Sequence, residues 1–184
     1  DTMVYISSAR ACLCKAGYTN QGLSTAECEA CEKGRYSATP GQSECLPCVA
    51  GQYQDALNAS ACVPCPRGTY SDSTGSSTCS LCPEGTDTEG KGFASEESCA
   101  CPEDTFQPLD GSRCLPCGEG SRCAGFGAEP ESSEGYLLWE ADADGLSIFR
   151  CRHLESSCPG GPRRTCAAGR LGTSCSECLS GMTP

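Results

Sequence analysis

Cysteine pairs of the form Cys-x-x-Cys recur at a fixed interval along this chain. They fall at Cys28/Cys31, Cys45/Cys48, Cys62/Cys65 and Cys79/Cys82, with the same spacing from each pair to the next. Three loops of equal length lie between them: CEKGRYSATPGQSEC, CVAGQYQDALNASAC and CPRGTYSDSTGSSTC. A fixed period of this kind indicates an array of one small unit, in which neighbouring copies stack along a line.

Cysteine supplies 20 of the 184 residues, whereas Leu, Ile, Val and Phe together supply only 22. A chain this poor in large apolar residues needs another source of stability. Disulfides are that source, because closing a loop of about 15 residues contributes ~3 kcal/mol in the chain-entropy model. We therefore predict a small disulfide-rich fold, a linear array of short β-hairpin modules with little regular secondary structure. Disulfides persist in oxidising compartments, so we expect an extracellular or cell-surface location reached through the secretory pathway.

The charged residues are unevenly distributed. Residues 1–149 hold 8 Lys/Arg and 22 Asp/Glu, whereas residues 150–184 hold 5 and 2. The acidic part repels nucleic acid and anionic lipid, and no apolar run reaches the ~18 residues of a membrane span. We expect no nucleic-acid binding and no direct membrane insertion. Two interpretations stay open: a solvated acidic surface, or a basic end that meets the acidic part of the next copy head to tail.

Alignment of the loops on their first cysteine shows further shared positions. A glycine lies three residues on, at Gly17, Gly34, Gly51, Gly68 and Gly85. An aromatic follows, at Tyr18, Tyr36, Tyr53, Tyr70 and Phe106. The residue ten on is Gly41, Asn58 or Gly75, and Gly and Asn are the residues that best tolerate a positive φ. Each module is therefore predicted to be a short two-stranded turn covered by an aromatic ring.

This combination of spacing, glycine and aromatic resembles the cysteine-rich repeats of ephrin receptors, of TNF receptors and of large multi-repeat surface proteins of protists and algae. The resemblance covers about residues 12–123 and is clearest over 28–82. It implies pairing within each loop, with the two residues inside each Cys-x-x-Cys as a linker between modules. The implied pairs are Cys31–Cys45, Cys48–Cys62, Cys65–Cys79, Cys82–Cys99, Cys101–Cys114 and Cys117–Cys123.

The N-terminal segment precedes the regular repeats. Residues 1–11 are predicted to be a strand or linker. Cys12-x-Cys14 resembles the end of an EGF-like module, which implies Cys14–Cys28 and leaves Cys12 to an upstream partner. The chain begins and ends in mid-pattern and shows no signal peptide, so we expect it to be part of a longer protein.

Residues 124–150 contain no cysteine, and we predict an acidic linker followed by a β-hairpin. The turn signal is Asp144-Gly145 between the apolar runs GYLLWE and LSIFR. The cluster of apolar side chains here has two interpretations, a local core under the hairpin or an interface patch. The interface candidates are Tyr136, Leu138, Trp139, Phe149, Arg150 and Arg152.

The tail, residues 151–184, resembles the end of a laminin-type EGF-like module, incomplete at the C-terminus. CAAGRLGTSCSEC matches the Cys-x-x-Gly…Gly-x-x-Cys-x-x-Cys form of that module. The resemblance implies Cys166–Cys175, with Cys178 pairing beyond Pro184. Partners for Cys151 and Cys158 stay open, and pairing with each other is the simplest choice.

Zinc binding is the main alternative to disulfides, because Cys-x-x-Cys…Cys-x-x-Cys falls near zinc-ribbon spacing. Zinc would leave eight cysteines without a role, and we favour disulfides with no metal and no cofactor. Glu140, Asp142, Asp144 and Gly145 match half of a calcium loop, but Cys151 stands where the last ligand belongs, and a solvated turn is favoured. The single histidine, His153, has no partner nucleophile, so no catalytic residue and no enzyme activity are predicted.

Asn58-Ala59-Ser60 is the only N-glycosylation sequon. In the three loops of equal length, the position of Asn58 carries Gly or Asn and the position of Ser60 carries Ser, so the sequon has an alternative origin in the repeat itself. An exposed turn of a secreted protein would still be modified, and we expect an N-linked glycan at Asn58.

The sequence favours an extracellular structural or scaffold segment of a larger repeat protein. Such a segment would assemble with itself or with other extracellular proteins in a filament, a matrix or a cell-surface coat. The alternative is a ligand-binding or spacer stalk of a membrane receptor ectodomain.

Overall fold

The computed structural model describes residues 2–6, 11–20, 27–109, 111, 113–142, 145–151, 158–167, 170–171, 175 and 177–178. Contacts between residues divide the chain into two compact units. The first comprises Asp1–Cys82 and Thr88–Cys99, and the second comprises Pro83–Asp87 and Ala100–Pro184. The division falls inside residues 12–123, the range that the sequence predicts as one array. The fold is small and disulfide-rich, as predicted, with short antiparallel hairpins throughout its described residues.

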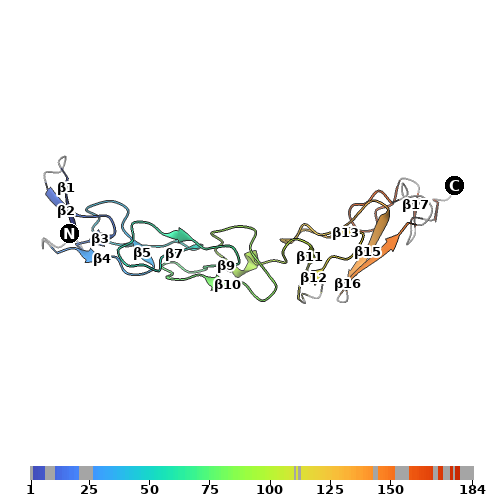
Figure 1. Ribbon diagram of the computed structural model, residues 1–184, viewed down its shortest axis with the longest axis horizontal. Helices are drawn as coiled ribbons and strands as arrows, with labels where there is room; N and C mark the ends of the chain where they lie inside the picture. Colours follow the sequence, from blue (N-terminus) through green and yellow to red (C-terminus); the bar gives the residue numbers. More distant parts are fainter. Residues whose placement is uncertain are drawn as a thin grey trace. The chain divides into compact units, whose positions relative to one another are not determined.

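The first unit is a succession of two-stranded hairpins in chain order (Figure 1). Its strand pairs are β1 (Met3–Ile6) with β2 (Ala11–Cys14), β3 (Tyr18–Thr19) with β4 (Glu29–Ala30), β5 (Arg35–Tyr36) with β6 (Leu46–Pro47), β7 (Gln52–Tyr53) with β8 (Val63–Pro64), and β9 (Thr69–Tyr70) with β10 (Ser80–Leu81). A 3₁₀ helix, η1 (Glu96–Ser98), follows and is capped by the Ser95 side chain, which accepts a hydrogen bond from the Glu97 N–H. No helix that could cross a membrane occurs among the described residues.

Five modules, each one disulfide loop, follow one another along the chain, and all of their residues except Pro83–Asp87 belong to the first unit. Modules 1 to 5 are closed by Cys14–Cys28, Cys31–Cys45, Cys48–Cys62, Cys65–Cys79 and Cys82–Cys99. In modules 2 and 3 the aromatic strand pairs with the two residues inside the next Cys-x-x-Cys, Tyr36 opposite Leu46 and Tyr53 opposite Val63. These two-residue segments are therefore return strands, and their interpretation as linkers between modules is wrong. The chain runs back along the first strand immediately after the cysteine that closes the loop.

Backbone hydrogen bonds join each module to the next. The Gly34 N–H donates to the Gln54 carbonyl at 2.8 Å, and the Cys48 N–H donates to the Gly34 carbonyl at 2.8 Å. The Gly75 N–H of module 4 donates to the Cys48 carbonyl of module 3 at 2.7 Å. All three bonds recur at the equivalent positions one module earlier and one module later, so the junctions repeat with the period of the cysteines. Such bonds contribute about 0.5–1.5 kcal/mol each.

The second unit continues with hairpins of more varied size. Its strand pairs are β11 (Thr105–Phe106) with β12 (Leu115–Pro116), β13 (Ser121–Arg122) with β14 (Glu131–Ser132), β15 (Tyr136–Asp142) with β16 (Gly145–Arg150), and β17 (Arg170–Leu171) with β18 (Glu177–Cys178). The predicted hairpin is confirmed as β15 and β16, but Gly145, which the sequence predicts as a turn residue, lies on β16 opposite Asp142. Asp144 itself lies outside the described residues.

The segment predicted as an acidic linker before this hairpin is folded. Ser132 is buried and forms a pair of backbone hydrogen bonds with Gly161, each 2.8 Å long. The Ser133 N–H donates to the Gly120 carbonyl, and the Cys151 N–H donates to the Gly135 carbonyl, both at 2.9 Å. These last two bonds repeat the junction pattern of the cysteine modules. The segment is therefore a module that lacks a disulfide of its own, and backbone bonds replace the cross-link.

Two small apolar clusters hold the second unit together. Leu137 packs with Cys151, Cys158 and Cys175, and Trp139 and Cys166 lie against this group. Phe106 packs with Cys123, while Leu115, Cys117 and Leu146 contact them. Cysteine sulfur thus supplies much of the buried apolar surface, which agrees with the scarcity of large aliphatic residues.

Candidate interaction surfaces and module junctions

Close backbone approaches in the first unit join modules that are not neighbours in sequence. A Cβ built on Gly34 would lie 2.0 Å from the Gly75 carbonyl oxygen, and Gly34 belongs to module 2 whereas Gly75 belongs to module 4. The same relation holds for Gly17 with Asn58, at 2.1 Å, and for Gly51 with Gly92, at 2.3 Å. Only glycine permits this approach, and the positive φ of Gly17, Gly34 and Gly51 also favours glycine. Each of these three modules is thus in contact with the second module after it.

A buried polar side chain lies at the centre of each junction, six residues after the first cysteine. The four residues are Ser37, Gln54, Ser71 and Thr88, with exposed fractions of 0%, 8%, 4% and 0%. In module 5 the Thr88 hydroxyl accepts a hydrogen bond from the Gly68 N–H and donates to the Gly90 carbonyl, both at 2.9 Å. The Ser71 hydroxyl bonds Ser76 at 2.7 Å across the turn. Sequence reasoning missed this position, although a small or polar residue at a fixed repeat offset is visible in the loops.

Tyrosine hydroxyl groups link separate turns at the surface. The Tyr70 hydroxyl donates to Glu96 Oε2 at 2.9 Å, and the Tyr136 hydroxyl donates to Glu119 Oε1 at 3.1 Å. In each case the hydrogen bond to the carboxylate is the main cause that raises the pKa of the phenol. The neutral phenol is the form that donates this bond, so the contact favours protonated tyrosine.

The structure pairs the cysteines within loops, as the family resemblance implies. Besides modules 1 to 5, it joins Cys101–Cys114, Cys117–Cys123 and Cys166–Cys175. It also pairs Cys151 with Cys158, whose partners the sequence leaves open. Among the described side chains Cys12 is the one free thiol, and it is exposed. The side chain of Cys178 lies outside the described residues.

Three buried cysteine sulfurs lie close together beside Leu137 of β15, and such a cluster could in principle bind a metal ion. Those of Cys151, Cys158 and Cys175 all lie within 4.8 Å of one another. They belong to two disulfides, Cys151–Cys158 and Cys166–Cys175. Zinc requires thiolates, and a disulfide sulfur is not one. This cluster is therefore a pair of packed cross-links that fill the small core.

The candidate interface residues of the β15–β16 hairpin differ in how far their side chains are exposed. Leu138 is fully buried, so it belongs to the core and is wrong as an interface candidate. Tyr136 is half-buried, and its hydroxyl donates a hydrogen bond to Glu119. Trp139 is half-buried beneath the Arg164 guanidinium, which lies 4.6 Å from the ring centroid. Phe149 and Arg150 are exposed, and they alone of the described candidates present their side chains to solvent.

Other predicted sites fall in the same region. Arg152 and His153 lie outside the described residues. Of the residues that match a calcium loop, Glu140 and Asp142 are on β15 and Gly145 is on β16, so their backbone forms the hairpin ladder.

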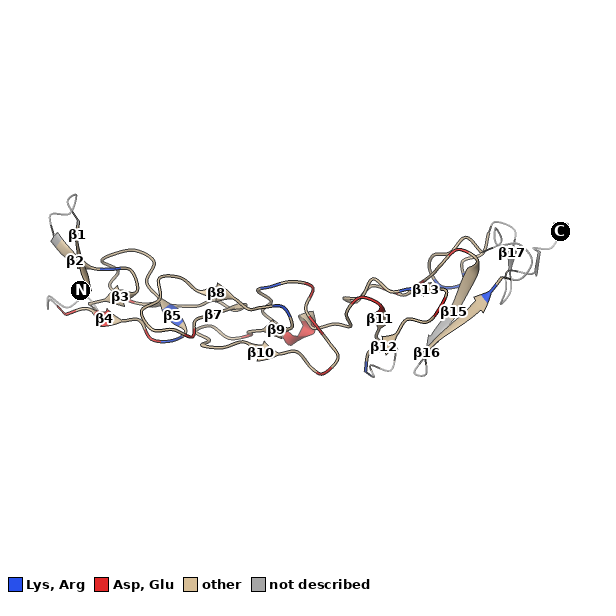
Figure 2. Cartoon of the chain, in the orientation of Figure 1, with Lys and Arg blue, Asp and Glu red and all other residues tan. Residues whose placement is uncertain are grey.

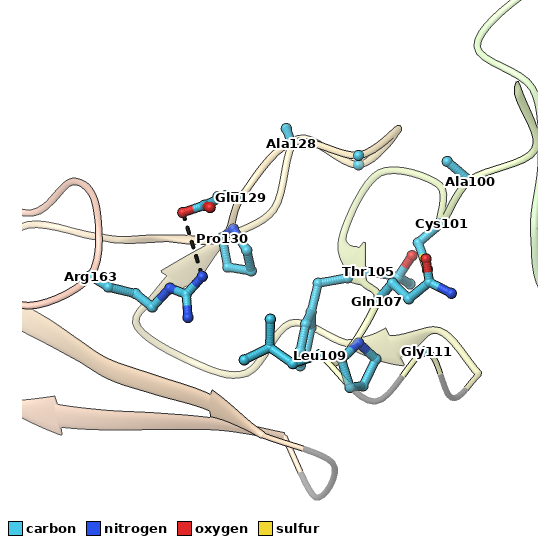
Figure 3. Close-up of a pocket in the computed structure, with 14 residues that line it drawn as sticks. Ala100, Cys101, Thr105, Gln107, Leu109, Gly111, Ala128, Glu129, Pro130 and Arg163 are labelled. Carbon is cyan, nitrogen blue, oxygen red and sulfur yellow. Dashed lines mark ion pairs between the residues drawn. The ribbon is translucent and has the colours of Figure 1, made fainter. Parts of the chain in front are cut away.

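A shallow cavity of about 420 Å³ lies in the second unit, between the turn after β11 and the segment before β14 (Figure 3). Buried Phe106, Pro108 and Pro130 form its apolar wall. Arg163 and Glu129 form an ion pair of 3.6 Å at its edge, drawn as a dashed line. The described residues that line the cavity include no group of buried titratable side chains, so we assign it no catalytic role.

Charged residues occur along both units (Figure 2). The basic end of the sequence is partly engaged within its own unit, because Arg163 pairs with Glu129 and Arg164 covers Trp139. Arg150 remains exposed. Attraction between the basic end and another copy would therefore depend on fewer cations than the sequence suggests.

Comparison with known proteins agrees with the repeat architecture. Residues 17–61 and 51–99 match the family described as tyrosine-protein kinase ephrin type A/B receptor-like. Neither match reaches the tail, whose EGF-like character stays a prediction. No curated protein sequence matches the chain. The matched repeats and the many disulfides point to an extracellular or cell-surface location. The chain is a cysteine-rich repeat protein whose repeats are similar to those of ephrin receptors.

Proposed function

We propose that this chain is an extracellular structural segment of a larger repeat protein, a stiff spacer that transmits position and load between its neighbours. The observation that carries the proposal is the backbone contact between every second module. Gly17, Gly34 and Gly51 each lie against the backbone two modules later. A module held by two successors cannot tilt about a single joint, whereas modules joined only to the next one can.

A distance measurement within the first unit tests this stiffness. Nitroxide labels carried on noncanonical amino acids at exposed positions Glu44 and Arg67 avoid any additional thiol. These positions belong to modules 2 and 4, and a stiff array gives a narrow distance distribution by pulsed electron paramagnetic resonance. Gly34→Ala, which crowds the Gly75 carbonyl, should broaden the distribution.

Gly85→Ala is the matched control, because Gly85 has a similar φ of 83° but nothing within 4 Å of its Cβ position. The two variants carry the same backbone strain, so only the contact differs. A wild-type distribution as broad as that of a flexible chain contradicts the spacer.

A second candidate is assembly with itself or with other extracellular proteins, head to tail. The uneven charge supports it, since residues 150–184 hold 5 Lys/Arg and 2 Asp/Glu while the rest of the chain is strongly acidic. Sedimentation velocity at low and high salt tests it, because screening weakens attraction between exposed charges. Association that weakens in high salt and in Arg150→Glu supports assembly, and a monomer under all conditions contradicts it.

The match to ephrin-receptor-like repeats equally supports a receptor stalk. A spacer stalk would share the stiffness argued above. A ligand-binding stalk requires a surface with affinity for a partner, and immobilised chain that captures a purified candidate ligand would support that alternative.

A further inference from the structure

The sequon Asn58-Ala59-Ser60 occupies the apex of the turn in module 3. Asn58 and Ser60 are both exposed, and Asn58 has a φ of 53°. The equivalent residues of modules 2, 4 and 5 are Gly41, Gly75 and Gly92, with φ between 77° and 81°. Asparagine is the residue besides glycine that tolerates this left-handed conformation. Module 3 is thus the one of these four that carries a side chain at its apex.

The residues that face the apex also differ between module 3 and modules 4 and 5. Gly75 and Gly92 face proline rings, because a Cβ on them would lie 3.7 Å from the Pro47 Cβ and 3.5 Å from the Pro64 Cβ. The residue that corresponds to these prolines in the repeat and would face Asn58 is Ala30, which is exposed. Alanine lacks the ring that would crowd a larger apex residue. The sequence therefore opens space at the apex where it places asparagine.

Tyr18 holds the asparagine side chain. The Asn58 Nδ2 atom donates a hydrogen bond to the Tyr18 hydroxyl, 3.3 Å away, from module 3 to module 1. An amide nitrogen carries two hydrogens, and this contact uses one of them. A sugar replaces one of the two hydrogens and leaves the nitrogen the other one to donate. The contact with Tyr18 can therefore persist after modification.

We propose that Asn58 carries an N-linked glycan and that Tyr18 fixes the direction in which the glycan leaves the array. In the transfer step, Asn58 Nδ2 attacks the anomeric carbon of a lipid diphosphate-linked oligosaccharide. The new carbon–nitrogen bond replaces the carbon–oxygen bond to the diphosphate, the nitrogen loses one proton, and the lipid diphosphate leaves. The remaining N–H keeps its bond to the Tyr18 hydroxyl. Modification on the unfolded chain requires only that the folded apex leaves room, as it does here.

The first experiment measures occupancy on the full chain secreted from eukaryotic cells. Mass spectrometry of the Asn58 peptide before and after peptide-N-glycosidase treatment should show a glycan that is removed. Ser60→Ala keeps Asn58 but destroys the sequon, and Asn58→Gly installs the residue of the other modules. Both variants should lose the glycan while keeping their disulfides. A secreted wild-type protein with an unmodified Asn58 peptide overturns the proposal.

The second experiment tests the positioning role of Tyr18. Tyr18→Phe keeps the ring but removes the hydroxyl, and Tyr53→Phe is the control in a module whose tyrosine has no asparagine partner among the hydrogen bonds of the described residues. We expect unchanged occupancy in both. The side-chain amide proton of glycosylated Asn58 should exchange with solvent several-fold faster in Tyr18→Phe only. Equal exchange in wild type and Tyr18→Phe would show that Tyr18 does not hold the glycan.

Discussion

Gly34 and the carbonyl oxygen of Gly75 are in direct apposition, although they belong to modules that are not neighbours in sequence. A Cβ on Gly34 would lie 2.0 Å from that oxygen, well inside van der Waals contact. The relation recurs for two further pairs of glycine and apex residue in the first unit. It makes the array a structure in which a module is held by the next two.

Gly34→Ala should therefore destabilise the first unit strongly. The substitution adds strain at positive φ, roughly 1–2 kcal/mol, and forces apart two backbones, roughly 1–3 kcal/mol more. Gly85→Ala carries the strain alone, because its Cβ position is empty to 4 Å. Denaturant unfolding of the oxidised proteins compares the two. Equal losses of stability would show that the close approach costs nothing.

Thr88 provides a test of the buried polar position. Thr88→Val preserves the shape but removes the hydroxyl that accepts from the Gly68 N–H, and leaving that group unpaired costs about 1–3 kcal/mol. Thr86→Val removes an exposed bond to the Pro83 carbonyl and should stay within about 0.5 kcal/mol of wild type. Thermal unfolding distinguishes them, and a Thr88→Val protein as stable as Thr86→Val contradicts the role of the hydroxyl.

The Tyr70–Glu96 bond makes stability depend on alkaline pH. Because the pKa of Tyr70 is raised in the folded state, its contribution is fully present below the ordinary tyrosine pKa of about 10 and is lost as pH rises through the folded pKa. Glu96→Ala should lower the pKa of Tyr70, since the hydrogen bond to Glu96 is the main cause of the shift. NMR titration of labelled tyrosine measures this value. The neighbouring Glu97→Ala should leave the pKa of Tyr70 unchanged. A Tyr70 pKa equal to that of wild type in both variants would show that Glu96 does not raise it.

Thiol labelling of the native protein should modify the peptide that contains Cys12, because this side chain is exposed and free. Cysteines of the described disulfides should label only after reduction. A zinc chelator should not change the pattern, which serves as the control for metal-bound thiolates. Extensive labelling before reduction, increased further by the chelator, would mean that the cysteines bind zinc.

Much of the local structure follows from the sequence. The fixed period and the left-handed turn at Gly41, Asn58 and Gly75 depend on spacing and on the conformational range of single residues, which are properties of short segments. The pairing of cysteines within loops was implied by the resemblance to known cysteine-rich repeats. The β15–β16 hairpin likewise follows from a turn signal between two apolar runs. Each of these features is decided within a single loop or hairpin of the chain.

The contacts of particular side chains do not follow from the sequence in this way. Leu138 and Trp139 are neighbours in an apolar run, yet the first is fully buried and the second lies half-buried beneath Arg164. Nothing in the sequence indicates that an arginine beyond the hairpin covers the tryptophan. The sequence also does not indicate that the segment before β15 is folded, because its junction bonds are made by backbone groups, which every residue possesses.

The sequence by itself determined the repeat and the need for glycine or asparagine at the turns, and the resemblance to known repeats implied the cross-links. Only the tertiary structure decided that Gly17, Gly34 and Gly51 meet the second module after their own, and that Thr88 and its equivalents are buried between modules. The physical reason is that a period sets the length of the repeating unit. The rotation and rise between units depend on how their backbones pack, and that packing brings residues two modules apart into contact.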